Sequence, residues 1–200
     1  MNKINYQIPK QRFELIRENI GQILTDELCG QDYVKQFENF KVWNERFIQF
    51  DLVEMPAINV AYHNTPYQDY TPKEQQGINE YHIDIHMNAI HTRDVKGDTD
   101  AALKCQRLAG IVRYILMSQE QFHLGFDPGV IQSRWVETLE MGKITDNDAK
   151  QTIVARLTFR VKANEVVANI APTEMEAIHT QVKLGETEKG QYFIYEVNNE

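Results

Sequence analysis

A proline-marked segment, Arg46–Tyr62 (RFIQFDLVEMPAINVAY), most constrains what this chain can fold into. Proline fixes its own φ and pushes the preceding residue toward an extended conformation, so no helix can run through Met55-Pro56. Apolar residues flank this point on both sides. The segment therefore predicts two strands, Lys41–Leu52 and Ala57–Tyr62, with a bend at Pro56 between them.

Two other segments have the three- and four-residue apolar periodicity of helices with one buried side. The first follows Pro9 and ends near Leu28, with Gly30 placed to cap its end. The second is predicted from Thr99 to Gln119, after a possible N-cap at Asp98. Its apolar stripe comprises Ala101, Cys105, Leu108, Val112, Ile115 and Leu116.

Three further segments alternate between apolar and polar residues as strands do: Tyr81–Ala89, Val130–Met141 and Gln151–Val161. In the second of them, we expect Ile131, Trp135 and Leu139 to share one face. Thr145–Asp148 is predicted to be the turn before the third. By contrast, His63–Gly77 holds two prolines and has no periodicity, which predicts a long loop that stays mobile until a partner orders it.

This order of elements predicts an α+β fold, in which two α-helices pack against an antiparallel or mixed β-sheet and a C-terminal β extension follows. Core-like patterning ends near Lys162, so we expect a domain at residues 1–162 and a β extension or arm at residues 163–200. Within the extension, Gln191–Val197 is a strand candidate with apolar side chains on both faces. These are Tyr192, Phe193, Ile194 and Tyr195. Such a strand needs a sheet edge, and we expect a neighbouring subunit, rather than this chain's own sheet, to provide it.

Composition narrows the class of protein. The formal net charge of −8 argues against sequence-specific nucleic-acid binding, which depends on clustered basic residues. No apolar run is long enough to span a bilayer, so we expect no membrane association. Two cysteines, Cys29 and Cys105, do not make a disulfide scaffold, and we expect both to be buried on helices in a reducing cytoplasm.

Signs of catalysis are weak. No serine lies in a G-x-S-x-G elbow and the carboxylates are scattered, so we expect a protein that is not an enzyme and needs no cofactor. His82, Asp84 and His86 would share one strand face, and these are residue types that bind zinc. Their spacing is poor for three ligands of one ion, so we expect a polar strand face. A small metal-binding protein using these three residues stays the less favoured alternative.

A second candidate surface is basic. Arg156, Arg160 and Lys162 alternate along one strand, and Arg134 could join their face if Val130–Met141 pairs with that strand. Like charges on one face repel unless water, acidic groups or a partner compensate for them. Either a solvated face or a contact with the acidic surface of another subunit fits this pattern.

With its neighbours in the sequence, the opening segment resembles phage tail-terminator proteins of the lambda minor-tail-protein U type. The matching residues are Arg46 for the family's arginine, Glu54, Pro56, Val60 and Tyr62 for its E-x-P-x-x-x-V-x-Y run, and Pro56 with Ala57 for its P-A step. Tyr81–Met87 (YHIDIHM), Asp98–Met117 and Asp146–Val161 are similar to later parts of that family. The resemblance covers about residues 9–162, and residues 163–200 extend past the usual end.

What the resemblance implies is a structural role in the virion tail or neck, after assembly in the host cytoplasm. Such proteins form a ring, typically a hexamer, on the tail tube protein, stop tube growth and present a surface to the head completion or neck protein. The resemblance does not separate this role from that of another head–tail joining, tail completion or tail-tube protein of the same fold. For residues 191–197 and for the basic face it implies subunit contacts.

Overall fold

The computed structural model describes residues 9–48, 50–68, 74–88, 97–145, 151–166, 180–187 and 190–197. Backbone contacts divide the chain into two compact units, residues 1–167 and residues 168–200. The helices of the first unit are α1 (Arg12–Cys29), α2 (Asp32–Lys35) and α3 (Gly97–Met117), with short 3-10 turns at Leu52–Glu54 and Gln119–Gln121. Its strands are β1 (Lys41–Asn44), β2 (Ala57–Asn64), β3 (Tyr67–Gln68), β4 (Glu74–Asn88), β5 (Ile131–Thr145) and β6 (Gln151–Val166).

These strands form one mixed sheet in the order β1-β2-β4-β6-β5, and β3 pairs with β4 beside that path. β1 runs parallel to β2, whereas the other neighbours are antiparallel. β4 and β6 are the long central strands, paired from Glu74↔Val166 to Asn88↔Thr152. The predicted α+β fold with helices packed on a mixed sheet is confirmed.

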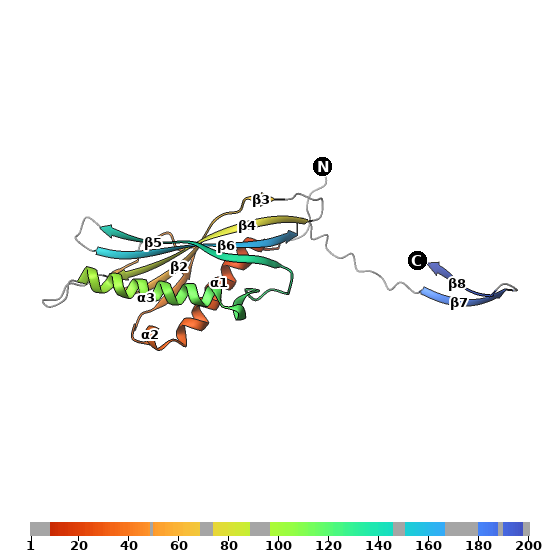
Figure 1. Ribbon diagram of the computed structural model, residues 1–200, viewed down its shortest axis with the longest axis horizontal. Helices are drawn as coiled ribbons and strands as arrows, with labels where there is room; N and C mark the ends of the chain where they lie inside the picture. Colours follow the sequence, from red (N-terminus) through yellow and green to blue (C-terminus); the bar gives the residue numbers. More distant parts are fainter. Residues whose placement is uncertain are drawn as a thin grey trace. The chain divides into compact units, whose positions relative to one another are not determined.

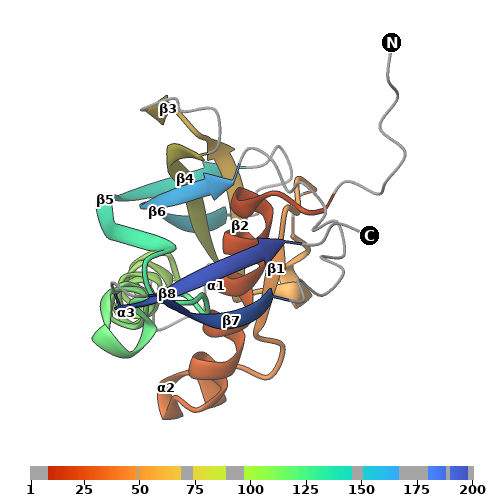
Figure 2. The same cartoon turned by 90° about the vertical axis from the view of Figure 1, so that its right-hand side faces the viewer.

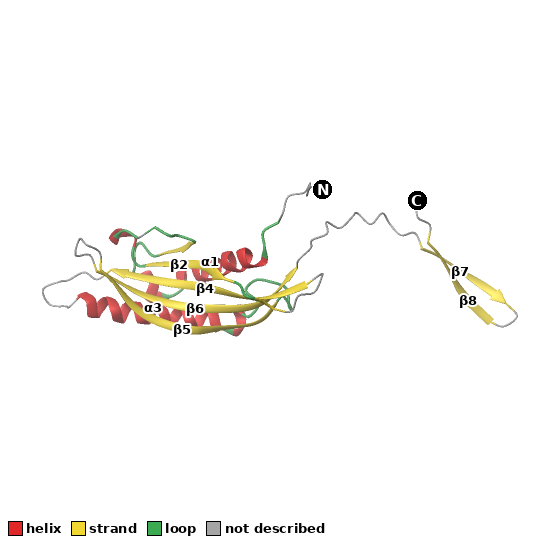
Figure 3. Cartoon of the chain, turned by 90° about the horizontal axis from the view of Figure 1, so that it is seen from above, coloured by secondary structure: helices red, strands yellow, loops and turns green. Residues whose placement is uncertain are grey.

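The helices pack on one face of the sheet, as Figures 1 and 3 show. α1 contacts β1, β2 and β6, α3 contacts β4, β5 and β6, and the two helices contact each other on the same side of the sheet (Figure 2). The apolar stripes predicted for both helices point into this layer. The fully buried core includes Ile16, Ile20, Leu24, Cys105, Leu108, Ile83, Ile85, Leu157 and Phe159.

Several boundaries differ from the prediction. β1 ends at Asn44, and the residues up to Leu52 do not continue it as a strand. The predicted loop His63–Gly77 is wrong where the end of β2, β3 and the first residues of β4 replace it. Thr65 and Pro66 do form a short connection, and residues 69–73 lie outside the described residues. The predicted turn at residues 145–148 also lies mostly outside them.

β5 departs from simple alternation because its register against β6 shifts twice, between Ile131 and Ser133 and between Val136 and Thr138. An extra residue at each bulge reverses which side chains face the core. Trp135, which pairs with Arg160, therefore lies on the face opposite to Ile131 and Leu139, so the predicted common face is confirmed for Ile131 and Leu139 and wrong for Trp135. The same shift moves Arg134 to the helix side, where it is buried.

The second unit contains a hairpin of β7 (Thr180–Thr187) and β8 (Gly190–Val197), paired from Thr180↔Val197 to Thr187↔Gly190. The partner expected for Gln191–Val197 was a neighbouring subunit or the main sheet. The structure instead pairs it with β7, a strand that the sequence did not predict. Contact between this hairpin and a neighbouring subunit stays a prediction.

We expect a chain truncated after Val167 to keep the fold of the first unit, because a compact unit has its own core. Both tryptophans, Trp43 and Trp135, belong to that unit. Urea unfolding followed by tryptophan fluorescence should give the same midpoint for the truncated and the full-length chain. A large fall in the midpoint would show that the hairpin is part of the core.

Candidate functional site

The face of the sheet opposite the helices, here called the outer face, carries the polar residues of β4 and β6. Strand alternation places His82, Asp84 and His86 on it from β4, and Arg156, Arg160 and Lys162 from β6. The prediction that His82, Asp84 and His86 share one face is confirmed. The three basic residues also share a face, whereas Arg134 does not join them.

Two of the basic residues on the outer face are neutralised within the chain. Arg156 makes a bidentate contact with Asp84, its cross-strand neighbour, through Nε–Oδ1 and Nη2–Oδ2 distances of 2.7 Å each. Arg160 lies between two carboxylates, 2.9 Å from Glu80 and 2.8 Å from Glu137. Cross-strand charge pairs of this kind stabilise a sheet and leave less net charge for a partner. The expected repulsion between like charges is thus compensated by acidic groups of the same chain.

Arg134 has a different role. Its guanidinium donates to the backbone oxygen of Ser118, just after α3, and lies 5.5 Å from the ring centroid of Phe122. Burial lowers the pKa of Arg134, because a buried charge loses hydration. We conclude that Arg134 fixes the end of α3 against β5 and offers little surface to another subunit.

The connection between β1 and β2 is held by Arg46. Its guanidinium contacts Glu54 at 3.0 and 2.7 Å, and its Cζ lies 4.5 Å from the ring centroids of both Trp43 and Phe50. Asn59 on β2 completes the arrangement, accepting from the Arg46 amide and donating to the Arg46 carbonyl. The hydrogen bond from Arg46 holds the pKa of Glu54 below its usual value. We call Arg46, Glu54 and Asn59 the clamp.

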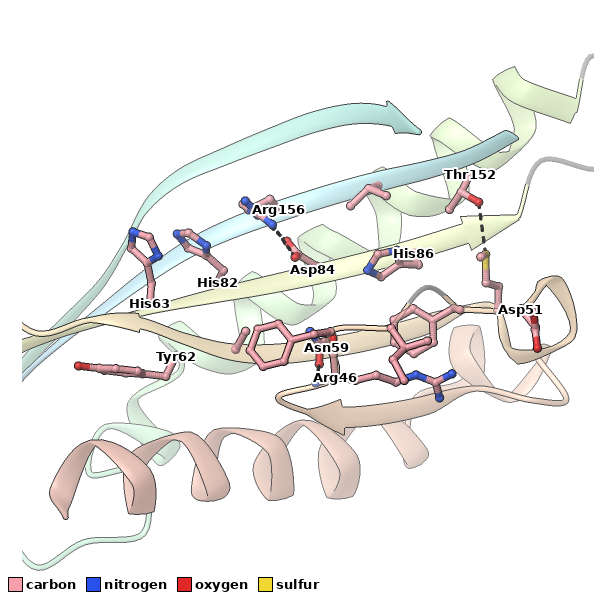
Figure 4. A pocket seen from close by; sticks show the side chains of 16 residues that line it. Arg46, Asp51, Asn59, Tyr62, His63, His82, Asp84, His86, Thr152 and Arg156 are labelled. Atoms are coloured by element: carbon pink, nitrogen blue, oxygen red, sulfur yellow. Dashed lines mark hydrogen bonds and ion pairs between the residues drawn. The ribbon is translucent and has the colours of Figure 1, made fainter. Parts of the chain in front are cut away.

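A pocket of about 440 Å³ lies between this connection and the outer face (Figure 4). Phe50 forms part of its wall and contacts the ring of His86, at 4.8 Å between centroids. Met55 contacts Thr152 on β6 at 3.9 Å. At the rim, the side chains of Phe47 and Ile48 are 83% and 77% exposed. This exposure is far greater than expected for apolar residues of the strand that the sequence predicted here.

His82, Asp84 and His86 do not converge on one point. Asp84 is engaged by Arg156, and His86 packs against Phe50. Burial lowers the pKa of both His82 and His86, which favours their neutral forms. The alternative of one metal site built from these three residues is therefore not supported by their arrangement.

A different cluster forms at the end of the pocket. The rings of His63 on β2 and His82 on β4 stack, with centroids 4.3 Å apart, and Figure 4 shows them side by side. The Nε2 atoms of both point at Glu80 Oε1, at 3.8 Å from His63 and 3.2 Å from His82. Among the described residues, His63, Glu80 and His82 are the one group of three His, Cys, Asp or Glu side chains close enough to share a metal ion.

The C-terminal candidates Tyr192, Phe193, Ile194 and Tyr195 all lie on β8. In the ladder they face Gly185, Leu184, Lys183 and Val182 of β7, respectively. Their side chains lie outside what the structure describes, so their proposed role in subunit contact stays a prediction.

Cysteine placement was predicted half correctly. Cys105 is buried on α3, its thiol donates to the Ile85 carbonyl, and burial raises its pKa to about 11. Cys29, at the end of α1, is exposed, so the expectation of two buried cysteines was wrong.

Comparison with known proteins does not assign the chain to a family: no family model matches the chain, and no curated protein matches it. Among the described residues, no helix has the length and hydropathy needed to cross a membrane.

Proposed function

We propose that this chain is a structural subunit of a phage tail, a tail-terminator-like protein that caps the tail tube as a ring and joins it to the head or neck. The observation that carries this proposal is a sheet whose two edge strands, β1 and β5, differ and pair on one side only among the described residues, with exposed apolar side chains on β5 and on the connection after β1. Closed rings of identical subunits are built from such unlike patches, one of which meets the other on the next copy.

The first edge is β1 with the connection that follows it. Phe47, Ile48 and Val53 are exposed there, although large apolar side chains usually avoid water when no partner covers them. We call these three residues patch A. The clamp holds their backbone in place, so the patch needs little reorganisation on binding.

The second edge is β5, which among the described residues pairs with β6 on one side only. Leu139 and Met141 on this strand are 43% and 39% exposed. We call these two residues patch B. β1 and β5 are the two ends of the sheet order; patch B lies on β5, whereas patch A lies on the connection that follows β1, so the two patches are unlike, as a head-to-tail contact requires.

The residues that carry the resemblance support the proposal through their part in fixing β2. Arg46 belongs to the clamp, and Pro56, Ala57 and Val60 are buried. Tyr62 packs on Phe13 of α1, at 4.7 Å between ring centroids. Because Arg156 and Arg160 are paired within the chain, the contact we propose depends on the apolar edges more than on the basic face.

Paired substitutions test the ring directly. We expect Phe47→Lys/Ile48→Lys and Leu139→Lys/Met141→Lys each to abolish rings, because one charged patch removes every contact in a head-to-tail ring. Light scattering after size exclusion, with and without purified tail tubes, measures the assembly. Tyr114→Lys is the matched control, since Tyr114 is 77% exposed on α3, beside Glu27 and Gln31 and outside both patches, and this variant should assemble normally.

Mixing the two double variants sharpens the test. Each retains one intact patch, so an equimolar mixture should form heterodimers and stop there, because the single good contact cannot propagate. A wild-type chain that is monomeric at every concentration and never binds tail tubes would refute the ring. Electron microscopy of particles that incorporate the chain then distinguishes a tail terminator from another joining or tube protein by its position.

A further inference from the structure

Three potential metal ligands meet at the outer face, and two of the distances between their donor atoms are close to those of a coordinated ion. A tetrahedral site with zinc–ligand bonds of about 2.0–2.2 Å holds its donors about 3.3 Å apart. The distances from Glu80 Oε1 to the Nε2 atoms of His82 and His63 are 3.2 and 3.8 Å. All three donor atoms lie within 4.8 Å of one another. Rotation of the two stacked imidazole rings would bring their Nε2 atoms onto a common ion with Glu80 Oε1.

The backbone builds this cluster in a specific way. His82 and Glu80 alternate on β4 and point to the same face. His63 lies at a bulge of β2, where the register against β4 shifts between Tyr62 and Asn64. Bulges re-aim single side chains and are frequent beside functional sites. Both histidines also line the pocket, so a hydrated ion can reach them from solvent.

Glu80 is prepared to act as a ligand. Its carboxylate is largely buried, and its second oxygen, Oε2, lies 2.9 Å from the guanidinium of Arg160. Partners of this kind orient a ligating group and are part of most metal sites. Oε1 is left facing the two imidazoles, one of which it already contacts at hydrogen-bond distance.

The donor set selects the class of ion. Two imidazole nitrogens and one carboxylate oxygen suit Zn²⁺ and similar first-row ions such as Co²⁺ and Ni²⁺, whereas Ca²⁺ and Mg²⁺ prefer oxygen ligands throughout. Three protein ligands leave a fourth position for water or another donor. We propose that His63, Glu80 and His82 form a binding site for a divalent transition-metal ion. This site is distinct from the arrangement His82-Asp84-His86 and does not depend on ring assembly.

Metal titration of the full-length chain tests this site. After removal of metal with a chelator, we expect Zn²⁺ to bind at one equivalent by calorimetry. Co²⁺ should give visible absorption bands typical of tetrahedral coordination. A wild-type chain that takes up no stoichiometric Zn²⁺ or Co²⁺ would overturn the proposal, and the cluster would then be a stacked pair of imidazoles beside a carboxylate only.

Single substitutions locate the site. His63→Ala and His82→Ala should each weaken Zn²⁺ binding at least about tenfold, the scale on which metal sites respond to lost partners. His63 has a side chain that is 50% exposed, so its removal should leave the metal-free chain folded, as judged by circular dichroism. His86→Ala is the matched control, because His86 lies on the same face of β4 and outside the cluster. Equal loss of metal in His86→Ala, or full retention in His63→Ala, would place the ion elsewhere.

Discussion

Replacing Phe159 by alanine should lower the free energy of unfolding of the first unit by about 3–5 kcal/mol. Phe159 is fully buried at the middle of β6, opposite Tyr81 on β4 and Val136 on β5. Its removal forfeits the transfer free energy of an aromatic ring and leaves a cavity between the sheet and the helices. Urea denaturation monitored by tryptophan fluorescence measures the loss.

The control for this experiment is Phe47→Ala, the same chemical change at an 83% exposed side chain. In the unassembled chain it should alter the free energy of unfolding by less than about 0.5 kcal/mol. Comparable losses in both variants would mean that Phe47 is buried by its own chain in solution. That result would contradict both the described fold of the connection and patch A.

Arg46→Ala should release the connection between β1 and β2 without unfolding the sheet. The substitution removes a bidentate ion pair and the contacts with Trp43 and Phe50 at once. We expect amide hydrogen exchange at residues 46–54 to become at least about tenfold faster, because local opening governs exchange in such segments. The Asp51 amide, which donates to Glu54 Oε2 at 2.9 Å, is a direct reporter.

Arg46→Lys separates charge from shape. Lysine keeps the positive charge and loses the planar fork and the stacking, so it should protect the connection only slightly better than alanine.

The clamp should also respond to pH. The pKa of Glu54 is lower in the folded chain, so the contribution of the clamp is present above the ordinary carboxyl pKa and is lost as the pH falls through the lowered value. Unchanged exchange in Arg46→Ala would show that the clamp does not hold the segment.

The sequence predicted best those elements whose burial follows a simple period. The stripes of α1 and α3 and the alternation of β6 are read correctly because each faces a single apolar layer. β4 was predicted to begin at Tyr81, but it begins at Glu74. Its first residues lack alternating apolar side chains, and pairing with the end of β6 supports them instead. Tertiary pairing, rather than local pattern, determines that boundary.

The errors at β5 and β1 have different local causes. Bulges in β5 change the parity of alternation, and nothing in the residues Ile131–Leu139 indicates them, so the sequence left the face of Arg134 open and placed Trp135 with Ile131. At β1, the apolar residues Phe47 and Ile48 suggested a longer strand. They continue the pattern and yet lie exposed, because the chain turns away at Glu45 with a positive φ of 55°.

The cluster of His63, Glu80 and His82 was predicted only in part. His82 was recognised as a possible ligand, and its neighbours along β4 were taken as its partners. Its actual neighbours in space are Glu80, two residues earlier, and His63 on another strand. His63 reaches them through the bulge in β2 and the antiparallel register of β2 with β4, and neither feature can be read from one sequence.

Because the helices pack on a single face of the sheet, neighbouring side chains of β6 lie in different environments. Every second side chain, from Ile153 to Val161, is locked into the core, while those between them meet water or charged neighbours. The surface of this protein can therefore diverge without disturbing the packing beneath it. A lineage could exchange the ion pairs at Arg156 and Arg160 for other contacts, and so change partners, while every copy still folds to the same sheet.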